Sequence, residues 1–157
     1  MKVTIFGTGY VGLVTAGCLV HKNHDVICYD TDIDRIKKIN DGNVPIFEPG
    51  LDKLIAKGVD SGKLLFTSSS QESLINPDII ILCVGTPDDG TGATSLKAIE
   101  SCAKTISELS NHSIAVLIKS TVPVGTSVKI QNLINKGIKA RRVNIKISVA
   151  SNPEFLH

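Results

Sequence analysis

Three glycines near the start of the chain are spaced to hold a phosphate group. They lie between two apolar segments, in the run Gly7, Thr8, Gly9, Tyr10, Val11 and Gly12. Between a strand and a helix, the first glycine permits a tight turn, the second lets a pyrophosphate approach the backbone, and the third lets the helix pack closely on the sheet. The helix N-terminus then offers free N–H groups and a partial positive charge. The run therefore predicts a dinucleotide pyrophosphate site, and the alternative is a merely flexible glycine turn.

A carboxylate follows at the distance that suits the ribose of a dinucleotide. Asp30 ends the second apolar segment, about 20 residues after the glycine run. It can accept hydrogen bonds from both ribose hydroxyls of an adenosine and would repel a 2′-phosphate, which favours NAD over NADP. One alternative is that Asp30 only caps the next helix. Arg35 leaves another choice open, since it can hold a 2′-phosphate, lie against the adenine, or pair with Asp30.

Strands and helices alternate along the chain. The apolar runs predict strands over residues 2–6, 25–30, 64–67, 79–84, 114–118 and 145–150. Helical spacing predicts helices over 11–21, 33–39, a short stretch from residue 51, 96–109, and 128–134 with a glycine, Gly137, just beyond it. Nearly continuous apolar strands are typical of a parallel sheet covered on both faces. We therefore expect a single α/β domain over residues 1–157, a doubly wound, mostly parallel Rossmann sheet of six strands with helices on both faces, in the order 3-2-1-4-5-6.

Polar loops follow three of the later strands. Ligands of open α/β sheets bind outside the carboxyl ends of the strands, so these loops are expected to face the nicotinamide and the substrate. Their members with a predicted cofactor contact are Val84, Gly85, Thr86, Pro87, Ser120 and Thr121. Each loop alone is also explained by turn chemistry. A hydroxyl at Thr121 and a carboxylate at Glu154 could order a water and take its proton.

The composition excludes several other classes of function. Lys plus Arg is 17 and Asp plus Glu is 15, so there is no general basic surface for nucleic acid, and aromatic residues are 4 % with no Trp. The basic residues between 136 and 146 are interpreted as a solvated loop. His21, His24 and His112 are interpreted as surface residues, and no stretch reaches the ~18 apolar residues of a membrane span.

The four cysteines point to a reducing compartment. They are Cys18, Cys28, Cys83 and Cys102, which form no CxxC motif and no zinc-like spacing. They are therefore interpreted as small buried hydrophobes, and the protein as cytoplasmic. The uncharged segment 3–20 also resembles a signal peptide ending at Cys18, which leaves a secreted lipoprotein as an alternative.

Five segments in this order resemble one known family. They are MKVTIFGTGYVGLV, VPIFEPGL, CVGTP, KSTVPVGT and SNPEFL, and together they cover essentially the whole chain. The chain closely resembles the amino-terminal NAD-binding domain of the nucleotide-sugar (UDP-glucose/GDP-mannose) dehydrogenases. KSTVPVGT and SNPEFL look most like the members that act on UDP-glucose. GDP-mannose and UDP-N-acetylhexosamine enzymes stay open, as does a non-catalytic dinucleotide-binding module.

The resemblance implies a reaction and a set of roles. Family members oxidise the sugar C6 alcohol to a carboxylate in two NAD-dependent steps through a cysteine-bound intermediate. By position, the glycine run would bind the pyrophosphate and Asp30 the adenosine ribose. Thr121 and Glu154 would orient the water that cleaves the thioester. The substrate-binding segment would begin with Glu154, Phe155 and Leu156.

The family's catalytic cysteine and lysine segments have no counterpart in this sequence. We therefore expect a fragment that binds NAD and does not turn over UDP-glucose, with His157 either native or added. The resemblance implies that the full-length enzyme is a homodimer, and it leaves the state of the fragment open.

Overall fold

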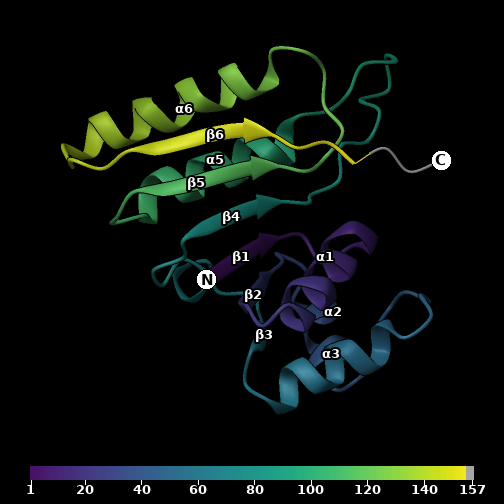
Figure 1. Ribbon diagram of the computed structural model, residues 1–157. Helices are drawn as coiled ribbons and strands as arrows, with labels where there is room; N and C mark the ends of the chain where they lie inside the picture. The colour runs from purple at the N-terminus through teal and green to yellow at the C-terminus, as the bar shows by residue number, and fades with distance from the viewer. Residues whose placement is uncertain (155–157) are drawn as a thin grey trace.

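Six parallel strands form one sheet in the computed structural model, which describes residues 1–154. Their order is β3-β2-β1-β4-β5-β6, which confirms the predicted doubly wound arrangement. The strands are β1 (Lys2–Phe6), β2 (Asp25–Tyr29), β3 (Leu64–Thr67), β4 (Ile79–Leu82), β5 (Ile114–Ile118) and β6 (Ile147–Ser151). Figure 1 shows β3 and β6 at the two edges of the sheet.

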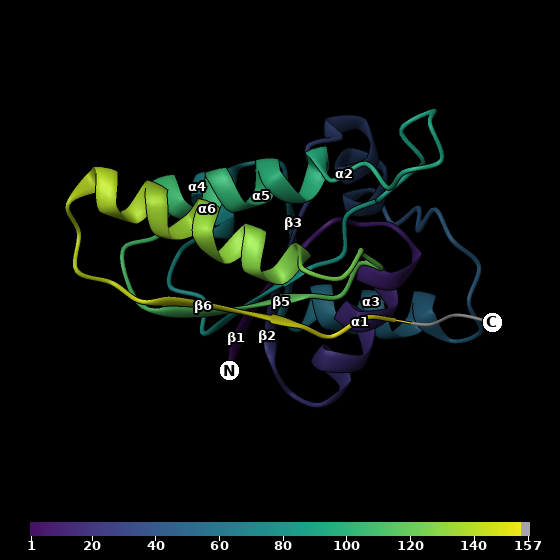
Figure 2. The same cartoon turned by 90° about the horizontal axis from the view of Figure 1, so that it is seen from above.

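Helices cover both faces of the sheet (Figures 1 and 2). They are α1 (Tyr10–His21), α2 (Ile33–Asn40), α3 (Leu51–Asp60), α4 (Ser70–Ser73), α5 (Lys97–Leu109) and α6 (Thr126–Arg141). The helices α5 and α6 pack side by side on one face, and α1 and α3 pack together on the other. The short helix α4, which Ser69 caps by accepting a hydrogen bond from the Glu72 N–H, was not predicted.

Alternate residues of the same strand enter two separate hydrophobic cores. In β4, Ile80 and Leu82 belong to the core under α5 and α6, whereas Ile81 belongs to the core under α1. In β1, Ile5 and Phe6 divide in the same way, and both side chains are fully buried. This division explains why the strands read as continuous apolar runs, since each strand is covered on both faces.

The register brings the carboxyl ends of the central strands to one edge. Phe6, the last residue of β1, pairs with Tyr29 and Leu82, the last residues of β2 and β4. Ile118 at the end of β5 pairs with Ser151 at the end of β6. The glycine run and the three polar loops therefore begin at neighbouring points on the same edge.

The last helix is longer than predicted. It runs from Thr126 to Arg141, so Gly137 lies inside α6 and does not end it. A Cβ at position 137 would lie 2.3 Å from the Ser107 Oγ of α5, so this glycine permits close packing of the two helices. Spacing in the sequence cannot distinguish a glycine that ends a helix from one that permits a helix crossing.

Two smaller predictions are wrong. The basic residues Lys136, Lys139 and Arg141 lie on α6 and not in a loop. The Arg141 guanidinium donates hydrogen bonds to the carbonyls of Ser107 and Ser110, which ties the end of α6 to α5. Strand β6 begins at Ile147, two positions later than expected, because residues 143–146 form no ladder.

Two of the histidines are not simple surface residues. The ring of His112 is half-buried and its Nε2 lies 2.7 Å from the Pro77 carbonyl oxygen. His24 is also half-buried, and only His21 is exposed, as predicted. Within residues 1–154, no helix is both long and apolar enough to cross a bilayer.

Candidate functional site

A cleft of about 710 Å³ opens at the carboxyl edge of the sheet and gathers most of the predicted cofactor residues. From the glycine run it includes Gly7, Gly9, Tyr10 and Val11, and from the second strand and helix it includes Asp30 and Arg35. From the later loops it includes Val84, Gly85, Thr86, Ser120, Thr121 and Glu154. Three predicted cofactor residues do not line the cleft: Thr8, Gly12 and Pro87. Phe155 and Leu156 fall outside the described residues.

Each of the three glycines of the run has a different environment. Gly7 has a φ of +103°, and a Cβ there would lie 2.6 Å from the Cys83 carbonyl oxygen. At Gly12 a Cβ would lie 2.0 Å from the Gly7 carbonyl oxygen, so only glycine allows α1 to start so close to the strand. At Gly9 a Cβ would meet no protein atom within 4 Å. The structure itself therefore requires glycine at the first and third positions, and the free space at Gly9 faces the cleft.

The N-terminus of α1 points its unpaired donors toward that space. Gly9 is the N-cap residue, no side chain caps the helix, and its first turn carries no acidic residue. The backbone N–H groups of the first turn are thus left for an external acceptor. Tyr10, also in this turn, donates its hydroxyl to the Glu48 carboxylate at 2.6 Å, which raises the pKa of the Tyr10 hydroxyl and joins the loop after α2 to the cleft rim.

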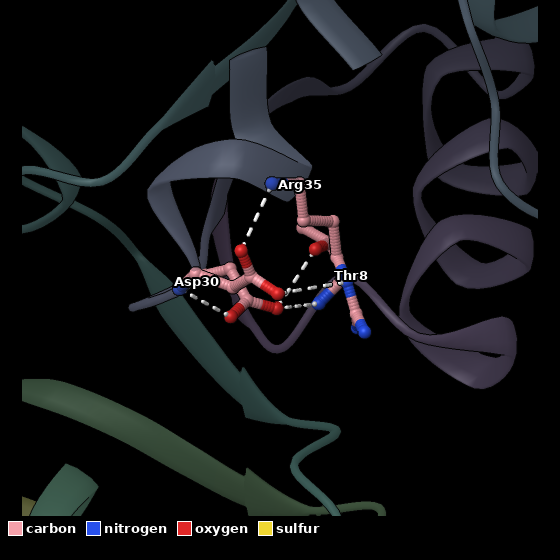
Figure 3. Close-up of polar contacts among 4 residues, drawn as sticks. Thr8, Asp30 and Arg35 are labelled. Carbon is pink, nitrogen blue, oxygen red and sulfur yellow. Dashed lines mark hydrogen bonds and ion pairs between the residues drawn. The ribbon is translucent and has the colours of Figure 1, made fainter. Parts of the chain in front are cut away.

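Asp30 is held in place by the glycine run (Figure 3). Its Oδ2 accepts hydrogen bonds from the Thr8 N–H and the Thr8 hydroxyl, both at 2.8 Å, and its Oδ1 accepts one from the Asp32 N–H at 3.1 Å. Burial by itself would raise the pKa of Asp30. The hydrogen bonds from Thr8 and Asp32, together with the charge of Arg35, outweigh burial and lower it. Asp30 is therefore a fixed anion at the mouth of the cleft.

Asp32, not Asp30, caps the following helix. The Asp32 carboxylate accepts a hydrogen bond from the Arg35 N–H at 2.9 Å, and the guanidinium of Arg35 lies 3.7 Å from the same carboxylate. The alternative in which Asp30 only caps a helix is therefore wrong. Arg35 pairs with Asp32 rather than with Asp30, and its side chain borders the cleft.

Hydroxyl groups join the loops on the other side of the cleft. Ser120 donates to the Val84 carbonyl at 2.6 Å, and Thr86 donates to the Thr121 carbonyl at 3.0 Å. Thr121 in turn donates to the Glu154 carbonyl at 3.1 Å. A hydroxyl has one donor and two acceptor positions, so these side chains still offer acceptors to an amide or a water.

Lys119, the first residue of the KSTVPVGT segment, borders the cleft although no role was predicted for it. Its ammonium forms an ion pair with the Glu154 carboxylate and borders the cleft, with only 18 % of its side chain exposed. The signal available in the sequence was its position directly after the fifth strand, next to Ser120 and Thr121. The cleft wall supplied by α5 was also missed, since Ala98, Ser101, Cys102 and Thr105 come from a helix with no motif of its own.

None of the cysteines near the cleft is activated as a nucleophile. Burial raises the pKa of both the Cys83 and Cys102 thiols to about 12, and it raises that of Cys28 as well. Cys18 is exposed on α1, and all four thiols are free. Within residues 1–154, no group of three or more His, Cys, Asp or Glu side chains is arranged to hold a metal ion.

Comparison with known proteins places this geometry in context. The family model described as "UDP-glucose/GDP-mannose dehydrogenase family, NAD binding domain" matches residues 1–157. The chain is 44 % identical over 99 % of its length to the UDP-glucose 6-dehydrogenase YwqF of Bacillus subtilis, and it covers 35 % of that protein. It is 39 % identical over 99 % of its length to the GDP-mannose 6-dehydrogenase of Pseudomonas savastanoi pv. phaseolicola, of which it covers 36 %.

A solved structure gives the same fold. The chain aligns over its full length with a GDP-mannose dehydrogenase from Pseudomonas aeruginosa in a ternary complex, with a TM-score of 0.91 and 35 % identity, and covers 37 % of that chain. The chain thus spans about a third of the length of the curated relatives it matches.

Proposed function

The chain belongs to the UDP-glucose/GDP-mannose dehydrogenase family as an NAD-binding domain, and on this premise we propose that it serves a UDP-glucose 6-dehydrogenase, which oxidises UDP-glucose to UDP-glucuronate in two NAD-dependent steps. The observation that carries the proposal is the cleft itself. It joins a phosphate-binding glycine run to a hydroxyl-rich edge where Thr121 is bonded to Glu154. NAD supplies the hydride acceptor when it is bound.

The residues of the first half of the cleft would hold the adenosine end of NAD. The N–H groups at the start of α1 are free to bind the pyrophosphate, which the open space at Gly9 lets approach. The ionised Asp30 would accept from the adenosine ribose. Arg35 is already paired with Asp32, which leaves its guanidinium to lie along the adenine rather than to hold a 2′-phosphate.

The second half would receive the nicotinamide and order a water. The backbone of Val84–Pro87 and the hydroxyls of Ser120 and Thr121 offer acceptors to a carboxamide. The Glu154 carboxylate would accept a proton from a water that the Thr121 hydroxyl orients. The ion pair with the Lys119 ammonium holds the Glu154 side chain at the edge of the cleft. Phe155 and Leu156 would continue with Glu154 into the sugar-binding segment.

The complete reaction belongs, on this proposal, to a longer protein. The chain covers about a third of its curated relatives, and burial raises the pKa of the two thiols that border the cleft, Cys83 and Cys102. We therefore expect the chain alone to bind NAD without oxidising UDP-glucose. The four free thiols support a cytoplasmic location, and family resemblance supports a homodimer for the longer enzyme.

GDP-mannose is the second candidate substrate. The comparisons include GDP-mannose 6-dehydrogenases at 36–39 % identity, close to the 36–44 % of the UDP-glucose enzymes. The sequence around Pro123 favours UDP-glucose. A UDP-N-acetylhexosamine remains a third candidate, and a non-catalytic dinucleotide-binding module is the alternative outside enzymology.

NAD binding and NADH formation test the proposal on the chain itself. Calorimetric titration of the chain with NAD should show one molecule bound per chain, and the absorbance of NADH should not rise when UDP-glucose is added. Oxidation of UDP-glucose by the chain alone would contradict the proposal that the reaction needs the longer protein.

The parent gene provides a further test. Beyond position 157 it should encode a catalytic cysteine segment. The encoded protein should prefer UDP-glucose over GDP-mannose and UDP-N-acetylglucosamine, and the opposite preference would reassign the substrate.

A further inference from the structure

The hydroxyl of Thr8 is buried within the glycine run. Thr8 has 0 % of its surface exposed, and its side chain has one hydrogen-bond partner in the structure, the Oδ2 of Asp30 at 2.8 Å. The backbone N–H of the same residue donates to the same oxygen at 2.8 Å. Figure 3 shows both bonds converging on one side of the carboxylate. A single residue of the glycine run thereby fixes both the position and the rotation of Asp30.

Counting acceptor positions shows what Asp30 has left for a ligand. An ionised carboxylate has about four lone-pair positions, two on each oxygen. Thr8 takes both positions of Oδ2, and the Asp32 N–H takes one of Oδ1. One position remains, on Oδ1. The two bonds from Thr8 therefore fix which side of the carboxylate, that of Oδ1, is left for a ligand.

We propose that Thr8 is a positioning residue for cofactor choice: its hydroxyl holds the Asp30 carboxylate in one orientation toward the adenosine ribose, so that a 2′-phosphate is rejected. The inference rests on the ribose contact proposed above for Asp30. It also assigns part of the discrimination between NAD and NADP to a residue that never touches the cofactor.

The physical reason is the repulsion between a 2′-phosphate and a carboxylate that is held in place. A 2′-phosphate at Oδ1 would face a carboxylate that cannot rotate away, because two hydrogen bonds hold its other oxygen. The groups around Asp30 that carry or can carry charge are Arg35 and Asp32 on α2, Cys102 on α5, and the neighbouring Tyr29. Of these only Arg35 is cationic at neutral pH, and it is paired with Asp32. Without the Thr8 hydroxyl, one of the two bonds that hold Oδ2 is lost, so Asp30 can turn and the repulsion weakens.

Replacing the hydroxyl by a methyl group tests the lock. Thr8→Val keeps the shape of the side chain and the backbone bond, whereas Thr8→Ser keeps the hydroxyl. Thr15→Val is the matched control, since the Thr15 hydroxyl bonds only to the Val11 carbonyl within α1. The affinities for NAD and NADP are measured by calorimetry between about pH 4 and pH 8, which brackets the ordinary carboxyl range. The ¹³Cγ shift of Asp30 is titrated in the absence of cofactor.

We expect Thr8→Val to weaken NAD binding about tenfold, as the loss of one hydrogen bond to a charged group would, and to weaken NADP binding less. The preference for NAD should fall, and the Asp30 titration should move to higher pH. Thr8→Ser should restore the preference and the titration, and Thr15→Val should leave both unchanged. A simple packing role would change stability without moving the cofactor ratio or the ¹³C titration.

Each contrary result has its own meaning. If Thr8→Val leaves both the NAD-to-NADP ratio and the Asp30 titration unchanged, the proposed lock is wrong. If Thr8→Val unfolds the chain, Thr8→Ser still decides, because a ratio that falls despite the retained hydroxyl also contradicts the lock. If Asp30→Ala itself leaves NAD affinity unchanged, the ribose contact proposed above fails instead.

Discussion

In the proposed binding mode, the adenosine side and the nicotinamide side of the cleft differ in how firmly contacts within the chain hold their side chains. On the adenosine side, Thr8 is fully buried and three hydrogen bonds hold Asp30. On the nicotinamide side, Thr121 is exposed, and its hydroxyl donates to the backbone carbonyl of Glu154. Contacts within the chain therefore already fix the residues of the adenosine side. The nicotinamide side is an open edge, whose hydroxyls still have acceptor positions for a bound molecule.

This difference predicts where substitutions act. On the adenosine side, a change at a packed residue such as Gly12 affects the fold and the cofactor together, whereas Gly9, which meets no protein atom, is the exception. On the nicotinamide side, a change affects binding a little and the fold hardly at all.

Gly12→Ala should have the largest effect. Its Cβ would lie 2.0 Å from the Gly7 carbonyl oxygen, so α1 must move away from the sheet. We expect a loss of about 3 kcal/mol of stability, in the upper range for overpacking, together with loss of detectable NAD binding. Urea unfolding and calorimetry would measure the two effects. Normal stability with normal binding would show that the close approach of α1 is not required.

Gly9→Ala separates the cofactor from the fold. Gly9 has a φ of −76°, and no atom lies within 4 Å of the position that a Cβ would take, so alanine fits the unliganded chain. Stability should change by no more than about 0.5 kcal/mol, as for an ordinary surface substitution. NAD affinity should fall at least about tenfold, since a methyl group stands where the pyrophosphate approaches. Unchanged affinity would move the pyrophosphate away from this turn.

Thr121→Val should have a smaller effect, confined to binding. The hydroxyl lies at an exposed edge, where a neutral hydrogen bond contributes little in net free energy. We expect NAD affinity to fall by less than about fivefold with no change in unfolding, and Thr121→Ser to restore it. A loss as large as that of Gly9→Ala would show that the nicotinamide side is as firmly built as the adenosine side.

The acid limb of the stability curve should show the smallest effect. The pKa of Asp30 in the folded chain lies below its ordinary value of 3.8, so the stabilisation it gives is complete above 3.8 and is lost as pH falls through the lower folded value. The stability of Asp30→Asn should therefore differ most from that of the parent chain above 3.8, and the two should converge in stronger acid. Urea unfolding along a pH series measures the gap. A gap that widens in acid would mean that the carboxyl is not held as an anion.

The adenosine side was largely predictable from the sequence because its signal is local. The glycine run, the strand before it and Asp30 lie close together in the chain, and each residue type has a narrow physical explanation. The sheet order followed from the same alternation of strands and helices. The link between Thr8 and Asp30 was not predictable, because it depends on how the ends of β1 and β2 align.

The nicotinamide side was only partly predictable. The loops were identified from the rule that ligands bind at the carboxyl ends of strands. The ion pair between Lys119 and Glu154 joins two strand ends that are distant in sequence, and no local pattern marks it. The wall supplied by Cys102 and its neighbours comes from the face of α5 that meets the cleft. Gly137 was misread because a helix crossing and a helix end both use glycine.

Competition between NAD and NADP is the most direct test of the account. The chain and Asp30→Ala are each titrated with both cofactors at neutral pH. We predict that the chain binds one NAD and prefers it to NADP by more than about tenfold, and that Asp30→Ala binds NAD more weakly and loses the preference. Equal binding of NAD and NADP by the unaltered chain, or a preference that survives Asp30→Ala, would contradict it.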